Sequence, residues 1–534
     1  DHRDLHSFPT RRSSDLIGID VGGTNTDAVL LDGRTILAWH KAGTTADVSS
    51  GIIDAITAVM GQARVPADAI EAVMIGTTHF TNAVVERAHL LPVGIIRIAL
   101  PATTGLPPLV GWPADIRDRM HGATVLVGGL MQYDGRVDTP LDEEAVRAAA
   151  RDFRQRGLRS VAVSAVFSPV AGAMEERAEA ILRQEMPGVR VTLSSRIGRL
   201  GLLERENAAI MNASLADLAT LVVSSFRAAL ARLDIRAPFF VSQNDGTLMG
   251  AETVEQYPVL TFASGPTNSM RGAAYLCGIK DALVVDIGGT TSDIGMLVNG
   301  FPREAAVTAD VGGVRTNFRM PDVLALGLGG GSLVAADGDD LAIGPRSVGF
   351  RIRERALVFG GDTLTATDIA VAAGCADIGD RSKVAHLPPS LVEAGVERIH
   401  RLIEEGVDRV KTSAAALPLI LVGGGAVLVS RPIAGVSEVV IPPHAGVANA
   451  IGAAVAQVGG EVDRVYHYGR IGREAALDQA RAEAIAAAAS AGADPATIEI
   501  FDLEERPLAY VPGGAVRIRA KAVGALRTGR HSVA

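Results

Sequence analysis

The chain has 534 residues, enough for two or more domains, and its 48% hydrophobic and 21% charged residues indicate a globular rather than a disordered protein. A formal net charge of −9 gives no electrostatic reason to expect nucleic-acid binding. Two cysteines, Cys277 and Cys375, cannot form a disulfide framework or a structural zinc site, and no apolar run reaches the ~18 residues of a membrane span, so we predict a soluble cytoplasmic protein.

Residues 1–16 differ from the rest of the sequence. They are rich in Arg, Ser and His and have no apolar core region, so they are not a secretory signal. We expect this stretch to be a disordered extension or a translated sequence foreign to the protein, and we expect the fold to begin at residue 17.

An eight-residue motif occurs twice. Residues 20–27 read Asp-Val-Gly-Gly-Thr-Asn-Thr-Asp and residues 286–293 read Asp-Ile-Gly-Gly-Thr-Thr-Ser-Asp, so five of the eight positions are identical. Each copy follows a short apolar strand and precedes a second one. Those second strands end at Asp32-Gly33 and Asn299-Gly300, which are signals of a two-residue hairpin turn. The repeat predicts two related α/β domains that face each other across a cleft.

The two motif copies have the residue types of a phosphate-binding turn. Paired glycines let the backbone present consecutive N–H groups to an anion, and the hydroxyl groups that follow add donors. The leading carboxylates, Asp20 and Asp286, stand at strand ends where they can hold Mg²⁺ through water. One such turn alone is more often an ordinary hairpin, whereas two matched copies favour a clamp on a polyphosphate. The predicted phosphate-binding residues are Gly22, Gly23, Thr24, Asn25, Thr26 and Asp27 in the first copy and Gly288, Gly289, Thr290, Thr291, Ser292 and Asp293 in the second.

A Gly-Thr-Thr-His sequence lies between the two copies. Thr77 and Thr78 follow a predicted strand and precede a predicted helix, so they either cap that helix or form part of an anion site at the cleft. His79 is a candidate for substrate contact or acid–base catalysis, and the alternative is an ordinary packed histidine. Asn82 is a further candidate for substrate contact, although its spacing to Glu86 and Arg87 is also typical of a solvated helix face.

Three more segments follow the second copy. The glycines of residues 329–331, with Gly330 and Gly331 as candidate substrate contacts, lack the βαβ context of a dinucleotide site. Thr367 and Asp368 are expected to cap a helix, with a role in the cleft as the alternative. A strand at residues 419–422 runs into Gly423, Gly424 and Gly425, which is a tight turn when taken alone. Because it follows two phosphate turns in chain order, we interpret it as the adenosine site.

The predicted domain organisation follows from these positions. The first domain is expected over residues 17–190 and the second over residues 191–460. Residues 461–534 are expected to form a short C-terminal α/β segment that begins with an Ala-rich helix and continues in two strands. The sequence Gly-x-x-x-x-Gly-Lys-Ser/Thr is absent, which disfavours a Walker-type nucleotide site.

The order of two phosphate turns and an adenosine turn resembles the superfamily of actin, Hsp70 and sugar kinases. Further segments resemble one branch, the A (ATP-binding) subunit of hydantoinases and 5-oxoprolinases. The resemblance covers about residues 17 to 458, and five segments carry it: Gly-Thr-Thr with Thr-Asn-Ala and Glu-Arg at 76–87, Ser-Gly-Pro at 264–266, Gly-Gly-Gly-Ser at 329–332, Gly-Gly with Thr-Asp at 360–368, and Pro-Pro-His-Ala-Gly-Val-Ala at 442–448.

This resemblance implies an enzyme that binds ATP and Mg²⁺ and phosphorylates the carbonyl oxygen of a cyclic amide, such as a hydantoin or 5-oxoproline, so that water opens the ring. It also implies a second hydrolase subunit as partner and an oligomer. The sequence departs from the family in its shorter C-terminal region. It also reads Ser-Gln-Asn-Asp-Gly at 242–246, where many members read Ser-Asn-Gly-Gly.

Two alternatives remain open. An acetone-carboxylase-like subunit would use ATP to phosphorylate a ketone enolate or bicarbonate for carboxylation. A nucleotide-gated regulatory module would signal to a partner through cleft closure, without chemistry on a small molecule. Phosphate release that depends on substrate separates the enzymes from the module, and bicarbonate dependence separates the two enzymes.

Overall fold

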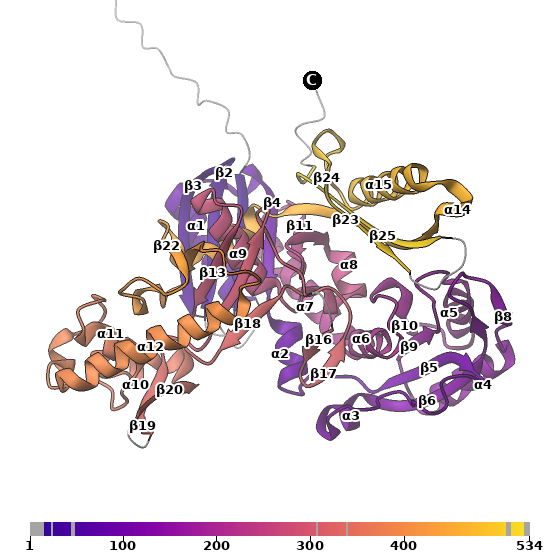
Figure 1. Ribbon diagram of the computed structural model, residues 1–534, viewed down its shortest axis with the longest axis horizontal. Coiled ribbons are helices and arrows are strands. Elements are labelled where there is room, and N and C mark those ends of the chain that lie inside the picture. The colour runs from indigo at the N-terminus through magenta and orange to yellow at the C-terminus, as the bar shows by residue number, and fades with distance from the viewer. Residues whose placement is uncertain are drawn as a thin grey trace, which may run out of the picture.

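The computed structural model describes residues 15–22, 25–43, 49–305, 308–337, 340–508 and 514–527. Its largest sheet has nine strands in the order β24-β25-β23-β12-β11-β4-β1-β2-β3 (Figure 1). The strands are β1 (Asp15–Val21), β2 (Asn25–Asp32), β3 (Thr35–Gly43), β4 (Ile70–Thr77), β11 (Phe239–Ser242), β12 (Thr247–Gly250), β23 (Gln457–His467), β24 (Glu499–Pro507) and β25 (Ala515–Gly524).

A second sheet of six strands repeats the centre of the first. Its path is β15-β14-β13-β21-β22, and β18 also pairs with β14. In each sheet the motif-bearing strand is antiparallel to the next strand in sequence and parallel to a later one: β1 with β2 and β4, and β13 with β14 and β21. The doubled opening predicted from the sequence is therefore confirmed. The strands are β13 (Ala282–Ile287), β14 (Ser292–Val298), β15 (Phe301–Pro302), β18 (Val323–Leu326), β21 (Leu417–Val422) and β22 (Val436–Val440).

Two helices, α9 (Ser264–Cys277) and α13 (Ala448–Ala454), connect the sheets. Small apolar side chains of α13 pack on β2, and apolar side chains of α9 pack on β13, β14 and β21. The helices cross in backbone contact. A Cβ on Gly272 would lie 1.9 Å from the Ala448 carbonyl oxygen, and one on Gly452 would lie 1.8 Å from the Asn268 carbonyl oxygen. The helix pair thereby fixes how the two halves face each other.

A third sheet lies apart from the other two, at the lower right of Figure 1. Its four parallel strands follow the order β10-β9-β5-β6 around their own apolar core. Its elements are β5 (Val93–Leu100), α3 (Ala114–Met120), β6 (His121–Gly128), α4 (Glu143–Gln155), β9 (Ser160–Ala165), α5 (Ala173–Glu185) and β10 (Arg190–Leu193), with the small hairpin β7 (Leu130–Met131) and β8 (Val137–Thr139).

Helices cover the two large sheets. Helix α6 (Leu202–Ser214) is almost entirely buried and packs against β9 and β10 of the third sheet, and its Glu206 forms a buried ion pair with Arg97 of that sheet. The first half also has the helices α1 (Ser50–Ala63), α2 (His79–Val85), α7 (Ala216–Arg232) and α8 (Ala251–Gln256), and the hairpin β16 (Ala309–Val311)/β17 (Val314–Thr316) lies against α2 and α6. The second half has the hairpin β19 (Ser332–Asp337)/β20 (Asp340–Ser347), with α10 (Ile352–Arg355), α11 (Ala366–Ala372) and α12 (Pro389–Val410).

Within the described residues, no single helix is long and apolar enough to cross a membrane. The pair α6 and α7 passes the same test of length and composition when taken together, but it is bent by 54° at its break.

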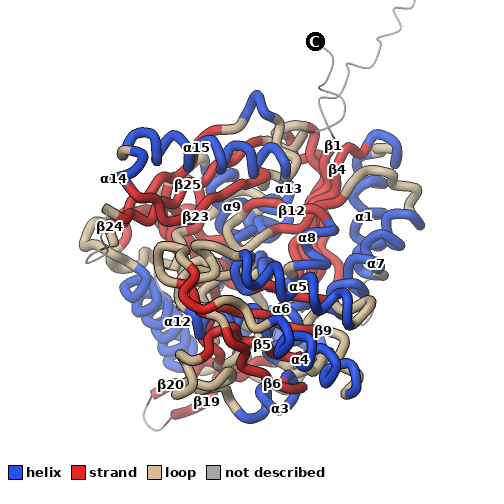
Figure 2. Tube along the Cα trace, turned by 90° about the vertical axis from the view of Figure 1, so that its right-hand side faces the viewer, coloured by secondary structure: helices blue, strands red, loops and turns tan. Residues whose placement is uncertain are grey.

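The C-terminal residues extend the first sheet instead of forming a separate segment. Strand β25 pairs with β23 and β24, and β23 pairs with β12. Helix α15 (Arg473–Ser490), with α14 (Tyr468–Ile471) before it, lies over β23 and β25 in both views (Figures 1 and 2). Alanines of α15 pack closely here, since a Cβ on Gly460 of β23 would lie 2.0 Å from the Ala488 nitrogen.

Three further expectations need correction. Strands β11 and β12, assigned above to the second domain, belong to the first sheet, because β11 pairs in parallel with β4. Strand β1 begins at Asp15, inside the stretch expected to be an extension, and residues 1–14 lie outside the described residues. The second hairpin turn is Asn299-Gly300 as predicted, with φ of 53° and 81°, but the first comprises residues 33–34. Both cysteines are free and half-buried.

Candidate nucleotide-binding site

A cavity of about 580 Å³ between the two large sheets brings the repeated motifs together. Four glycine segments that are far apart in the sequence contribute to its wall. They are the two Gly-Gly turns, the Gly-Gly-Gly turn of residues 423–425 and the Gly-rich loop of residues 329–331. Its lining includes Asp20, Gly22, Asn25, Asp27, Lys41, Ser269, Asp286, Gly288, Gly289, Gly330, Ile352, Arg353, Phe359, Thr367, Ile378, Gly423, Gly424, Gly425, Val427 and Asn449.

The two turns have the same backbone hydrogen bond. The Gly22 N–H donates to the Asn25 carbonyl at 3.0 Å, and the Gly288 N–H donates to the Thr291 carbonyl at 2.9 Å. Gly23 and Thr24, both predicted to contact phosphate, lie outside the described residues. The hydrogen bond that closes each turn is therefore repeated along with the sequence.

The hydroxyl groups of the turns differ from expectation. Ser292 was predicted to donate to phosphate, but it is buried and donates to the Leu328 carbonyl at 2.6 Å. Thr26, the matching residue of the first turn, is also buried and does not line the cavity. Thr290 and Thr291 are exposed outside the lining residues. The walls are therefore mainly glycine backbone and carboxylates, because the hydroxyls at the start of β2 and β14 turn into the protein.

The first turn holds two facing carboxylates. Asp20 of β1 and Asp27 of β2 are cross-strand partners. Burial, and then the charge of Asp27, raise the pKa of Asp20 to about 6. Asn449 of α13 donates to Asp20 Oδ2 at 2.9 Å, and Lys41 Nζ lies 2.7 Å from Asp27 Oδ2. The Oδ1 atoms of both carboxylates are buried and have no hydrogen-bond partner within the described residues.

The second turn repeats this pair with Asp286 and Asp293, which are also cross-strand partners. Burial raises the pKa of Asp286, and Ser269 of α9 opposes this by donating to its Oδ2. Burial, and then the charge of Asp286, raise the pKa of Asp293 to about 7. Asp293 does not line the cavity.

The Gly-Gly-Gly turn approaches the second motif closely. Gly423 has a φ of +84°, and a Cβ there would lie 2.2 Å from Asp286 Oδ1. The Gly425 N–H donates to the Ile287 carbonyl at 2.7 Å, while Gly424 has open space on its Cβ side. Four large apolar side chains line the same cavity, as a flat heterocyclic base requires. They are Ile352, Phe359, Ile378 and Val427.

The Gly-rich loop packs on the second turn. The N–H groups of Gly330 and Gly331 donate to the carbonyls of Gly288 and Gly289 at 3.0 and 2.7 Å. Thr367 donates its hydroxyl to the Gly330 carbonyl at 2.8 Å and lines the cavity. The cap of α11 is Thr365, with Asp368 completing a capping box, so the predicted capping role of Thr367 is corrected. Gly330 lines the cavity and Gly331 does not.

The Gly-Thr-Thr-His sequence lies beside the first turn but outside the lining residues. The Thr78 N–H and hydroxyl both donate to the Val21 carbonyl at 3.3 Å, so Thr78 binds the end of β1 and makes no side-chain cap. Thr77 Oγ1 lies 2.6 Å from His79 Nδ1, and burial lowers the pKa of His79. Asn82 donates to the Thr78 hydroxyl at 3.4 Å. None of these four residues lines the cavity.

Arg87 departs from the solvated face expected for it. It lies past the end of α2 with a φ of +57°. Its guanidinium donates to the carbonyls of Val84 and Gly312 at 2.8 Å and to Asp115 at 2.8 Å. One side chain therefore joins α2, the β16–β17 hairpin and α3.

The sequence interpretation missed three polar residues of the site: Lys41, Ser269 and Asn449. Ser269 of α9 donates a hydrogen bond to Asp286, and Asn449 of α13 donates one to Asp20, so each crossing helix contacts the leading carboxylate of one motif. A signal for them was present, since each lies within five residues of a quoted family segment, Ser-Gly-Pro or Ala-Gly-Val-Ala. Lys41 had no local signal, because only strand pairing brings it beside Asp27.

The oxygen-rich turns fit a hard divalent cation that is shared with a phosphate ligand. No group of three or more His, Cys, Asp or Glu within the described residues could hold a metal ion. Mg²⁺ is usually bound by one or two carboxylates, waters and substrate phosphates, which matches Asp20 and Asp286 at the two turns. Both carboxylates line the cavity, as a contact with a metal-bound water there requires.

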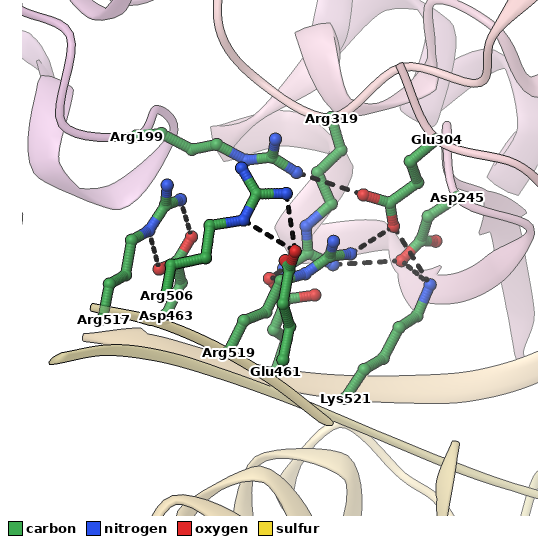
Figure 3. A network of polar contacts seen from close by, with 11 residues as sticks. Arg199, Asp245, Glu304, Arg319, Glu461, Asp463, Arg506, Arg517, Arg519 and Lys521 are labelled. Atoms are coloured by element: carbon green, nitrogen blue, oxygen red, sulfur yellow. Dashed lines mark hydrogen bonds and ion pairs between the residues drawn. The ribbon is translucent and has the colours of Figure 1, made fainter. Parts of the chain in front are cut away.

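A second cavity of about 570 Å³, bordered by β23 and β25, is lined by paired charges. Its charged residues include Asp463, which pairs with Arg517, and the network of ion pairs continues beyond this cavity to Lys521, which pairs with Asp245 at 2.8 Å (Figure 3). Burial opposes ionisation of Asp245, but Lys521 and Arg319 hold its pKa well below its usual range. Asp245 belongs to the stretch where the sequence departs from the family pattern. The network is therefore a junction of the C-terminal strands with both halves of the molecule.

The fold and the cavity place the chain in the class of actin- and sugar-kinase-like ATPase folds. Residues 16–186 match the family described as the hydantoinase/oxoprolinase N-terminal region, and residues 205–378 match that described as hydantoinase/oxoprolinase. The chain belongs to the hydantoinase/oxoprolinase family.

Curated relatives include two enzyme subunits. The chain is 29% identical over 409 residues to the acetophenone carboxylase gamma subunit of Aromatoleum aromaticum, covering 69% of this chain and 54% of the relative. It is 29% identical over 387 residues to the caprolactamase subunit alpha of Pseudomonas jessenii, covering 67% and 54%. The chain thus spans about half the length of these relatives.

Two solved structures share the fold. ATP-dependent caprolactamase from Pseudomonas jessenii matches with a TM-score of 0.75 and 22% identity, over 96% of this chain and 88% of that chain. Nucleotide-free acetone carboxylase matches with a TM-score of 0.69 and 18% identity, over 96% and 88%. At these identities the likeness concerns the fold alone.

Proposed function

We propose that this chain is the ATP-binding subunit of a hydrolase that phosphorylates and opens a cyclic amide of the hydantoin or 5-oxoproline type. The observation that carries the proposal is the convergence of two Gly-Gly turns, each with a buried carboxylate, and a Gly-Gly-Gly turn on one cavity. Membership of the hydantoinase/oxoprolinase family and similarity to a caprolactamase subunit support the amide as acceptor.

The residues divide the cavity into two ends. The apolar side chains and Gly424 suit the adenosine, and the two turns suit the phosphates. Asp20 and Asp286 would hold Mg²⁺ through water, and Asn449 and Ser269 fix their orientation. Bound Mg²⁺ supplies charge neutralisation at the phosphates. The Gly22 and Gly288 N–H groups donate within their own turns, so these glycines would give the phosphates close access to the backbone, and the bound cation would supply most of the electrostatic stabilisation.

Phosphorylation of the amide carbonyl oxygen converts a poor electrophile into an activated imidate that water can open. His79 stays a proposed acid–base residue. Burial keeps its imidazole neutral and Thr77 orients it, as a proton acceptor requires. Because His79 lies outside the cavity lining, this role requires the acceptor to approach from the side of α2.

A partner subunit is part of the proposal. Caprolactamase and acetophenone carboxylase relatives are both named as subunits, and the chain spans about half of their length. We therefore expect ATP binding by the chain itself and complete ring opening only in the presence of the partner.

An ATP-dependent ketone carboxylase subunit is the second candidate. Identity to the acetophenone carboxylase gamma subunit is as high as that to the caprolactamase subunit, at 29%. In this case the phosphoryl acceptor is a ketone enolate or bicarbonate.

ADP formation from MgATP separates the candidates, because transfer of the phosphoryl group to the acceptor yields ADP even when ring opening waits for the partner. The chain is assayed alone with hydantoin, 5-oxoproline, caprolactam, acetone and acetophenone, each with and without bicarbonate. ADP formation stimulated by a cyclic amide without bicarbonate supports the hydrolase, and ADP formation that needs a ketone with bicarbonate supports the carboxylase. ATP binding without stimulation by any of them contradicts both for the isolated chain and favours a regulatory module.

A further inference from the structure

Three charged residues stand in one row across the first sheet. Asp20 of β1 is the cross-strand partner of Asp27 of β2, and Asp27 is the cross-strand partner of Lys41 of β3. Lys41 Nζ lies 2.7 Å from Asp27 Oδ2, with the lysine side chain about one-third exposed at 34% and the Asp27 side chain buried at 2%. Lys41 also lines the cavity. The ammonium group therefore lies at the boundary between a buried carboxylate and the open cavity.

The second half of the molecule lacks this lysine. Asp286 is the cross-strand partner of Asp293, and Asp293 pairs on its other side with Ala325 of β18. The two halves otherwise repeat strand order, turn geometry and both carboxylates. Burial, and then the charge of Asp286, raise the pKa of Asp293 to about 7, with no described cation opposing the rise, whereas Lys41 opposes the rise that burial causes in the pKa of Asp27. The lysine is thus an addition specific to the first half.

Lys41 is placed at the phosphate end of the cavity. The cations among the described lining residues are Lys41 and Arg353. Lys41 contacts Asp27 and therefore lies beside the carboxylates of the first turn, whereas Arg353 makes no such contact with either pair of carboxylates within the described residues and follows the apolar Ile352 in the sequence. The charge of Lys41 also lowers the pKa of Asp286, which belongs to the other half, so its field reaches both turns. A nucleotide whose base lies on the second half would extend its terminal phosphate toward Lys41.

We propose that Lys41 contacts the terminal phosphate of a bound nucleoside triphosphate, exchanging its ion pair with Asp27 for that contact, and so distinguishes triphosphate from diphosphate. Lysine suits this exchange, because its ammonium is a point charge on a flexible four-carbon stem. Hydrogen bonds from a cation to phosphate are among the strong ones in proteins. This inference rests on the proposed function, because it presumes that the cavity binds a nucleotide.

Isothermal titration of the chain with MgADP and with the magnesium complex of the non-hydrolysable triphosphate AMPPNP tests the proposal. The Lys41→Met variant should lose about 10- to 100-fold in affinity for AMPPNP, the range of one hydrogen bond to a charged group, with less than about 3-fold change for ADP. Lys41→Arg should keep part of the preference. Lys411→Met, which removes an exposed lysine that contacts the Gly435 carbonyl, should match the wild type.

A second pair of variants tests whether Lys41 contacts the phosphate or only neutralises the charge of Asp27. Removing Lys41 alone leaves a buried carboxylate without its cation, which can unfold the first turn. The double variant Asp27→Asn/Lys41→Met avoids this. It should show the same loss of AMPPNP affinity, whereas Asp27→Asn alone should retain the preference for AMPPNP.

The outcomes are distinct. If the double variant regains the wild-type preference, or if Lys41→Met weakens ADP and AMPPNP equally, Lys41 only neutralises Asp27 and the inference is overturned. A wild-type chain that binds neither nucleotide overturns the proposed function itself, and the inference with it. Binding of both nucleotides by the wild type, with a loss confined to AMPPNP in the two Lys41→Met variants, supports both.

Discussion

Asp286 and Asp293 face each other across β13 and β14, and burial and mutual repulsion keep the pKa of Asp293 near neutrality. Like charges at directly opposed positions of a sheet are destabilising, so the second turn stores an unfavourable interaction that protonation relieves. Asp20 and Asp27 form the same cross-strand pair, but the positive charge of Lys41 offsets the repulsion between them. The two halves of the repeat therefore share a geometry but differ in charge balance.

This pair predicts a pH dependence of stability. The pKa of Asp293 is raised from 3.8 to about 7, so between these values the folded state binds more protons than the unfolded state. Stability should fall as pH rises through this window. In the Asp293→Asn variant, the free energy of unfolding should fall by about 2–4 kcal/mol less over this pH range than in the wild type. This magnitude follows from the difference between 3.8 and about 7, reduced for partial exposure. Urea unfolding of both proteins from pH 4 to 8 measures it, and parallel profiles would contradict the assignment.

The crossing of α9 and α13 predicts a steric effect at Gly272. Because a Cβ there would lie 1.9 Å from the Ala448 carbonyl oxygen, Gly272→Ala must push the helices apart. We expect a loss of about 1–3 kcal/mol in the free energy of unfolding, as for other overpacked contacts. Gly265→Ala in the same helix is the matched control, since its Cβ would lie 3.8 Å from the Thr78 methyl group. Equal unfolding curves for the two variants would argue against the tight crossing.

Neighbouring glycines of the Gly-Gly-Gly turn should respond differently. Gly423→Ala places a Cβ 2.2 Å from Asp286 Oδ1 at a φ of +84°, so it should cost at least about 1 kcal/mol of stability and weaken nucleotide binding. Gly424→Ala meets no atom within 4 Å and should keep the stability of the wild type. Since Gly424 lines the cavity, its variant should still lower nucleotide affinity. Chemical unfolding and titration with MgADP distinguish the two effects.

The charged network around β25 predicts a large penalty at Asp245. Asp245→Asn removes the shorter of the two ion pairs of the buried Lys521, leaving it the 3.7 Å contact with Glu304, and also removes an ion pair of Arg319, which should cost about 3 kcal/mol. The depressed pKa of Asp245 means that this stabilisation is present above the unfolded pKa and is lost as pH falls through the folded value. Asp118→Asn, at an exposed pair with Arg117, should change stability by less than about 1 kcal/mol. Similar urea midpoints for both variants would contradict a structural role for the network.

The local parts of the site could be predicted from the sequence, and the non-local parts could not. The repeat of Asp20 and Asp286 with their glycines gave the fold class and the two turns, because strand, turn and strand are adjacent in the chain. The role of Ser292 was wrong, since a hydroxyl facing the cavity and one facing Leu328 have the same sequence signature.

Pairing between distant strands set the remaining features. The domain boundary was misplaced because β11 joins β4 across more than 160 intervening residues. Lys41 was missed for a related reason, since its partner Asp27 lies on another strand of a sheet whose register periodicity alone does not fix.

Binding of MgATP to the chain and to its Asp20→Asn and Asp286→Asn variants, by titration calorimetry, tests the two-turn site most directly. We predict that the wild type binds and that each variant loses binding by at least about 10-fold with unchanged circular dichroism, because each carboxylate orients the cation from its own half. Absence of MgATP binding by the wild type, or unchanged binding by both variants, would contradict the account.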